Sequence, residues 1–106
     1  MEQGKNQFIY VLRLAPRLRK EENWTDRDEN AVERHFAKLK ELLNEGKLLL
    51  AGKTEGLDDK TFGIVVFEAE TQEEAEKIVR SDPAVSEGVM TAELFPYHVA
   101  LMRKSL

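Results

Sequence analysis

Apolar positions along this chain follow two periods, which divide it into four predicted strands and two predicted helices. Spacings of three and four residues predict one helix after Thr25 and a shorter one after Thr71. Runs rich in aliphatic, aromatic and β-branched residues predict strands at residues 8–14, 47–51, 61–68 and 89–95. The predicted order is therefore strand–helix–strand–strand–helix–strand.

The first helix is expected to bury one apolar stripe along its length. The stripe consists of Val32, Phe36, Leu39 and Leu43. Thr25 or Asp26 can cap the start of the helix, and Gly46 can adopt the left-handed conformation that ends it. His35 lies about 60° from the centre of the stripe at about 100° per residue. We therefore expect His35 at the border between core and solvent.

The second helix and the last strand have separate end signals. The second helix opens on a capping box, Thr71 to Glu74. It is expected to end at Asp82, because a residue before proline avoids the helical region. Pro96 is expected to stop the last strand.

The order of elements predicts an α+β, ferredoxin-like βαββαβ fold. Two right-handed crossovers place both helices on one face of a four-stranded antiparallel sheet. The strands at residues 8–14 and 61–68 are apolar on both faces, so the face without helices also needs a cover. An uncovered apolar face of this size is typical of an interface. We therefore expect a homodimer in which the two sheets face each other.

Composition narrows the class of protein. The 106 residues fit one domain, residues 1–106, with 42% hydrophobic and 34% charged residues. A net charge of -4 argues against a nucleic-acid partner. The absence of cysteine excludes disulfides and thiolate sites, and two histidines make a metal site improbable. No signal peptide or membrane-length apolar run is visible, so we expect a soluble, cytoplasmic protein without a membrane partner.

His35 and Asp82 form the one acid–base constellation that the chain offers, since histidine moves protons near neutral pH and aspartate commonly orients it. A helix-flank histidine with its tip in water and a turn aspartate before proline are the alternatives. Arg13, on the first strand, is a candidate to bind an anionic group of a substrate. The alternative is an end-of-strand arginine that reaches solvent. Tyr10 is a candidate pocket residue, although strand tyrosines more often belong to a core or an interface.

With these motifs in place, the chain resembles the YCII-related (YciI-like) family. The matching segments are the His35 helix running into "LNEGKLLLAG", then "FGIVVFEAETQEEAE", then "SDPAVSEG" and a final strand that ends at Phe95 and Pro96. The resemblance covers about residues 7–98 and leaves residues 99–106 as a tail. It implies a ferredoxin-like subunit of a dimeric α+β barrel, with a site centred on His35 and Asp82. Most members have no assigned reaction, and at least one relative is associated with removal of chloride from a chlorinated hydroxyquinone.

Two positions depart from the family pattern. Members often carry proline where this chain has Lys53, and a bulky residue where it has Ala84. Both positions are expected to shape the pocket, so Lys53 joins Arg13 and Tyr10 as a candidate substrate-binding residue.

The expected function is a small enzyme without a cofactor, which uses the His35–Asp82 pair for lyase or elimination chemistry on a small organic substrate. A homodimer that binds a small molecule without turnover is the alternative. A cofactor-free oxygenase is suggested by fold analogy alone.

Overall fold

The computed structural model describes residues 6–104, which form four strands, three α-helices and two short 3-10 helices. The strands are β1 (Asn6–Leu14), β2 (Leu48–Lys53), β3 (Gly63–Ala69) and β4 (Met90–Tyr97). The helices are η1 (Pro16–Arg19), η2 (Glu21–Asn23), α1 (Asp26–Asn44), α2 (Gln72–Arg80) and α3 (Pro83–Ser86). Every predicted strand and helix is present in this order, and α3 is an addition. None of the helices in this described part is both long and apolar enough to span a membrane.

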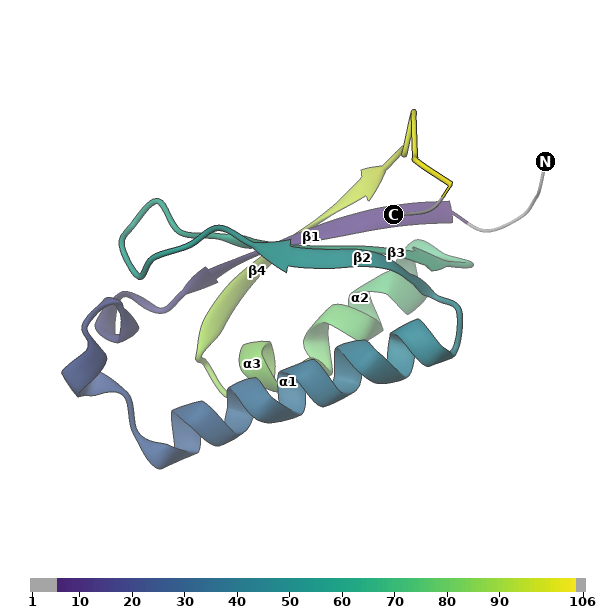
Figure 1. Ribbon diagram of the computed structural model, residues 1–106. Coiled ribbons are helices and arrows are strands. Elements are labelled where there is room, and N and C mark those ends of the chain that lie inside the picture. Colours follow the sequence, from purple (N-terminus) through teal and green to yellow (C-terminus); the bar gives the residue numbers. More distant parts are fainter. Residues whose placement is uncertain (1–5, 105–106) are drawn as a thin grey trace.

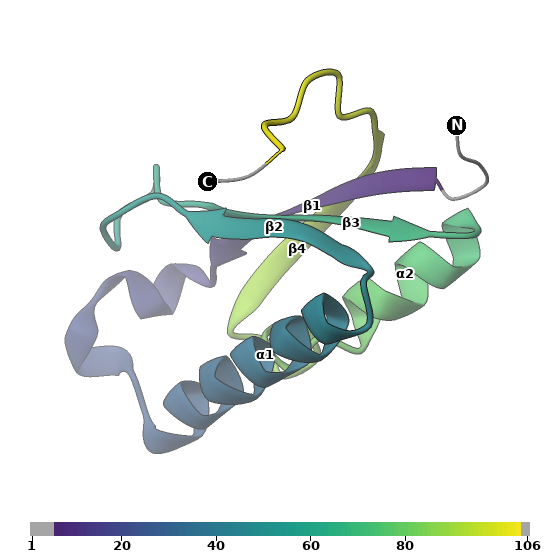
Figure 2. The same ribbon diagram turned by 45° about the vertical axis from the view of Figure 1, so that its right-hand side comes forward.

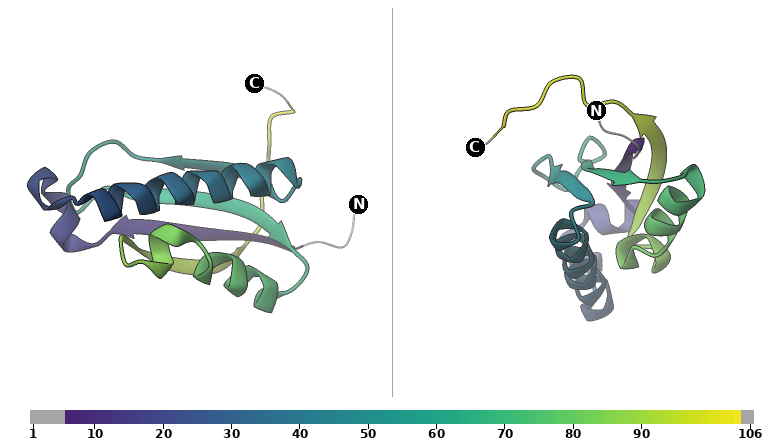
Figure 3. Two further views of the ribbon diagram at one scale, coloured as in Figure 1. Left: turned by 90° about the horizontal axis from the view of Figure 1, so that it is seen from below. Right: turned by 90° about the vertical axis from the view of Figure 1, so that its right-hand side faces the viewer.

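The four strands form one antiparallel sheet in the order β2-β3-β1-β4. Figures 1 and 3 show α1, α2 and α3 together on one face of this sheet, with the other face free of helices. The predicted α+β, ferredoxin-like fold is therefore confirmed.

The central strand β1 carries apolar side chains on both faces, as predicted. Phe8, Tyr10 and Leu12 are buried against the helices. Ile9 and Val11 alternate with them and point to the open face of the sheet, where they remain partly exposed. The main core thus lies between the sheet and the helices, a smaller cluster forms around Leu18, Ala31 and Val89, and a further apolar surface lies on the opposite face of the sheet.

The predicted phase of the stripe on α1 is wrong. Phe36 is 51% exposed and Leu43 is 55% exposed, whereas His35 is only 5% exposed. The buried apolar residues of the helix are Ala31, Leu39 and Leu42. The reason is tertiary, because α1 packs against α3 as well as against the sheet edge at β2, and α3 is not visible in the sequence pattern (Figure 1). The helix is therefore rotated so that His35, and not Phe36, faces inward.

The ends of the elements follow local chemistry with one exception. Thr25 caps α1 in a reciprocal capping box with Asp28, and Gly46 has φ +79°, the left-handed conformation expected after the helix. Pro96 does not stop β4, which continues to Tyr97. Because β4 is an edge strand, a residue without an N–H group is tolerated there.

Candidate acid–base site

His35 and Asp82 meet in the interior although 47 residues separate them in the chain. His35 Nδ1 lies 2.8 Å from each carboxylate oxygen of Asp82. His35 projects from the middle of α1, and Asp82 is the N-cap of α3. The packing of α1 on α3 therefore creates the contact.

Asp82 is fully buried, and three donors hold its carboxylate in place. Oδ1 accepts the backbone N–H of Ala84 at 2.9 Å, which is the capping bond of α3. Oδ2 accepts the hydroxyl of Tyr10 at 2.7 Å, and His35 Nδ1 completes the set. A buried carboxylate is costly without such partners, so these bonds fix both its position and its orientation.

Tyr10 supports Asp82 from the central strand. It is fully buried and does not line the pocket, so its predicted contact with a substrate does not fit the structure. Burial, followed by the negative charge and hydrogen bond of Asp82, raises the pKa of Tyr10 far above its ordinary value. Tyr10 therefore stays protonated and donates to Asp82.

The hydrogen bond to Asp82 assigns the tautomer of His35. A carboxylate that already accepts from Tyr10 and Ala84 requires an N–H from the ring, so Nδ1 carries the proton. In the neutral imidazole, Nε2 then keeps a free lone pair. Among residues 6–104 no buried side-chain nitrogen or oxygen lacks a partner, and Nε2 has no hydrogen bond to this part of the chain. Nε2 is therefore accessible, and His35 belongs to the wall of a pocket.

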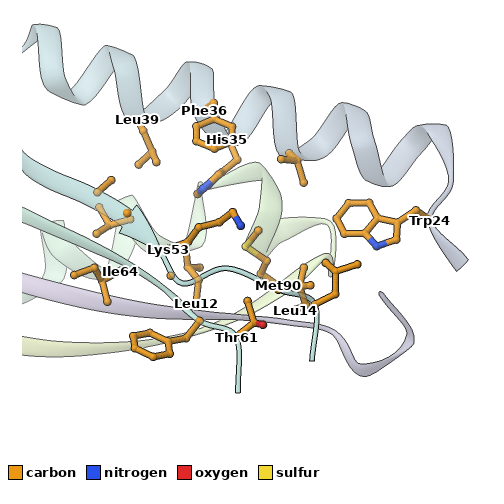
Figure 4. Close-up of a pocket in the computed structure, with 18 residues that line it drawn as sticks. Leu12, Leu14, Trp24, His35, Phe36, Leu39, Lys53, Thr61, Ile64 and Met90 are labelled. Atoms are coloured by element: carbon orange, nitrogen blue, oxygen red, sulfur yellow. The ribbon is translucent and has the colours of Figure 1, made fainter. Parts of the chain in front are cut away.

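This pocket has a volume of about 280 Å³ and lies between α1, the sheet and the loop that joins β2 to β3 (Figure 4). Its wall is mainly apolar and includes Leu12, Trp24, Phe36, Leu39 and Met90. The polar side chains in the wall are His35, Lys53 and Thr61. Within the described residues, no group of three or more histidine or acidic side chains is arranged to hold a metal ion. The pocket therefore matches a small, largely apolar molecule with few polar groups.

The structure separates the two predicted cationic residues. Lys53 lines the pocket, on the same face of the sheet as Leu12. Arg13 lies on the opposite face, because neighbouring residues of a strand point in opposite directions. It is exposed, and its guanidinium carbon lies 5.5 Å from the ring centroid of Phe62. His35 and Lys53 thus line the same pocket, Asp82 contacts His35 without lining it, and Arg13 is not part of the wall.

The segment before α1 contributes Trp24 to the pocket, which the sequence pattern missed. Arg17 donates two hydrogen bonds to the buried Asp28, at 3.0 and 2.7 Å, and these bonds lower the pKa of Asp28 well below its usual range. The Trp24 indole N–H donates to the Leu18 carbonyl at 2.8 Å. Residues 17–24 show no apolar periodicity, so the sequence pattern offers no signal that Trp24 faces the pocket.

Comparison with known proteins agrees with this architecture. One similar solved structure is 5-chloro-2-hydroxyhydroquinone dehydrochlorinase (TftG) from Burkholderia phenoliruptrix AC1100, in complex with 2,5-dihydroxybenzoquinone. The two chains are 21% identical with a TM-score of 0.57, over 87% of this chain and 93% of the other. No curated protein sequence matches the chain. The sequence model of the YCII-related domain matches residues 10–97. This chain therefore belongs to the YCII-related family.

Proposed function

We propose that this protein is a small-molecule enzyme in which His35 transfers a proton and Asp82 orients the imidazole. The observation that supports this role best is the His35–Asp82 contact, 2.8 Å long, at the wall of a largely apolar pocket. Nε2 is free to take a proton from a bound molecule. The imidazolium formed in this way is stabilised by the carboxylate on Nδ1.

The chemistry that suits these groups best is elimination. His35 Nε2 removes a proton from the substrate, the electron pair of that bond forms a double bond, and the leaving group departs with its own electron pair. The proton then passes from Nε2 to solvent or to the leaving group. This reaction needs one positioned base and a pocket that excludes bulk water. The dehydrochlorinase activity in the name of the similar structure supports this choice.

We further propose that the protein acts as a homodimer through the open face of its sheet. Ile9, Val11 and Ile64 share this face beside Leu50, which is 48% exposed. Figure 2 shows the helices on the opposite side, and the C-terminal segment in yellow above the open face, so a second copy would dock beside this segment or displace it. Burial of these side chains gives a second copy a driving force for docking.

The test first measures turnover of a panel of halogenated and hydroxylated ring compounds by the wild-type protein. Protein variants are then assayed with a compound that is converted. Replacement His35→Ala should reduce kcat by about 10²–10⁴-fold, the usual contribution of positioned proton transfer. Asp82→Asn should reduce it less, and the double variant should be little worse than His35→Ala. The control is His98→Ala, which removes the second histidine at an exposed position near the chain end.

The same experiment separates an enzyme from a binding protein. If compounds bind to the pocket but none is converted, the protein is a binding module and the proposed catalytic role of His35 is wrong. Equal loss of activity in His35→Ala and His98→Ala would point to a nonspecific effect. Circular dichroism of each variant must show an intact fold, because removal of the Asp82 charge also affects buried partners.

A further inference from the structure

The pocket wall contains a single residue with a permanent charge, Lys53. The other lining side chains are aliphatic, aromatic or neutral polar apart from His35, and none is a carboxylate. The residue therefore gives this pocket a feature of its own.

Lys53 has no acidic partner in the described part of the chain. None of the ion pairs between residues 6 and 104 includes it. Its ammonium makes one long hydrogen bond, 3.3 Å, to the carbonyl of the next residue, Thr54. The loop between β2 and β3 carries three carboxylates, Glu55, Asp58 and Asp59, yet Asp58 is occupied by the backbone of Lys60 and by Thr61. The charge of Lys53 is thus available for a ligand.

The sheet register directs Lys53 into the pocket. Lys53 is paired with Gly63, on the face that carries Leu12 and Val65. A Cβ atom on Gly63 would lie 3.3 Å from the Gly52 carbonyl oxygen, which is tight, and 3.5 Å from Lys53 Cβ, which is ordinary contact, so Lys53 lies directly beside Gly63 on this face. Figure 4 shows Lys53 projecting from the sheet and His35 projecting from α1 into the same space.

An ammonium beside an apolar wall favours one class of ligand. Lys53 is itself exposed, so solvent screens its attraction to an anion in part, and the adjoining apolar wall lowers the local dielectric on the pocket side. The apolar wall favours a ligand with a ring or a short hydrocarbon chain. A volume of about 280 Å³ has room for one or two rings, since a cavity of about 150 Å³ already binds benzene. A ligand that satisfies both conditions is flat, small and carries one negative oxygen.

We propose that the pocket selects small ring compounds with one anionic oxygen, as carboxylate or phenolate, and that the Lys53 ammonium binds this oxygen while His35 Nε2 faces the ring. The inference rests on the proposed function as far as the pocket is a small-molecule site. It goes further because it assigns the charge of the ligand and the residue that recognises it.

The test uses a matched pair of probes, 4-ethylbenzoate and its neutral analogue 4-ethylbenzamide. Affinities are measured by calorimetry and by fluorescence of Trp24, which is the single tryptophan of the chain and lines the pocket. The wild type should bind the carboxylate about 10- to 100-fold more tightly than the amide, as expected for a hydrogen bond to a charged group. Lys53→Met should abolish this preference and leave amide affinity unchanged, whereas Lys53→Arg should keep it.

Lys60→Met is the control, because Lys60 lies on the loop that follows Lys53, is exposed and does not line the pocket. It should retain the wild-type preference for the carboxylate. Equal binding of both probes by the wild type, or an unchanged preference in Lys53→Met, would overturn this inference and leave the proton-transfer role intact. Failure of both probes to bind at millimolar concentration would overturn it together with the pocket as a ligand site. If the protein shows no turnover but prefers the carboxylate in a way that depends on Lys53, only the proposed catalytic role of His35 is wrong.

Discussion

The hydroxyl of Tyr10 offers a direct test of the buried network, because Tyr10→Phe removes one oxygen and preserves the ring. In the folded protein this oxygen donates a 2.7 Å hydrogen bond to Asp82 Oδ2, and both residues are fully buried. The ring itself packs edge-on against Phe67, with centroids 5.7 Å apart, and this contact remains in the variant. The substitution therefore isolates one charge-assisted bond.

The expected effect can be estimated from this geometry. A hydrogen bond to a charged group contributes about 1.5–3 kcal/mol, and no water replaces the lost donor without extra space. We therefore expect a loss of about 2 kcal/mol in the free energy of unfolding. With a urea slope of about 1–3 kcal/mol per molar, the midpoint falls by about 1 M. The remaining donors, His35 and Ala84, still hold Asp82, so the variant should fold.

Urea unfolding at neutral pH measures the effect, with Tyr97→Phe as control. The Tyr97 ring is 45% exposed, and loss of its hydroxyl should change stability by less than about 0.5 kcal/mol. A double-mutant cycle with Asp82→Asn should give a coupling energy of about 1–3 kcal/mol. Equal small effects in both tyrosine variants, or a coupling near zero, would refute the hydrogen-bond network.

The remaining predictions concern a turn, an ion pair and the assembly. Gly46→Val should lower the free energy of unfolding by about 1–2 kcal/mol, because φ is +79° and a β-branched residue is strained there; an unchanged denaturant midpoint would contradict this. Arg17 lowers the pKa of folded Asp28, so their pairing stabilises the protein above the unfolded pKa of about 4 and is lost as pH falls through the folded value. Asp28→Asn should therefore lower Tm at neutral pH and narrow its gap to the wild type in strong acid, and a constant gap would argue against the pair. Sedimentation at micromolar concentration should show twice the 12.2 kDa chain mass, and a 12.2 kDa species alone would exclude the dimer.

The order and type of the elements were predictable because they depend on local chemistry. Apolar runs located each strand, spacings of three and four residues located both long helices, and Thr25 and Gly46 marked the ends of α1 correctly. Pro96 misled the prediction because the effect of a proline depends on whether its strand lies at an edge. That property belongs to the sheet and not to the segment.

The residue types of the candidate site were visible in the sequence, but their arrangement was decided by tertiary packing. The sequence alone determined that a histidine on the first helix and an aspartate before proline were the available acid–base groups. Only the packing of α1 on α3 rotated His35 inward and brought it to 2.8 Å from Asp82. Likewise, only the sheet register separated Lys53, which lines the pocket, from Arg13 on the other face. Periodicity reports which face of an element is apolar, whereas the contacts between distant elements determine which polar groups meet.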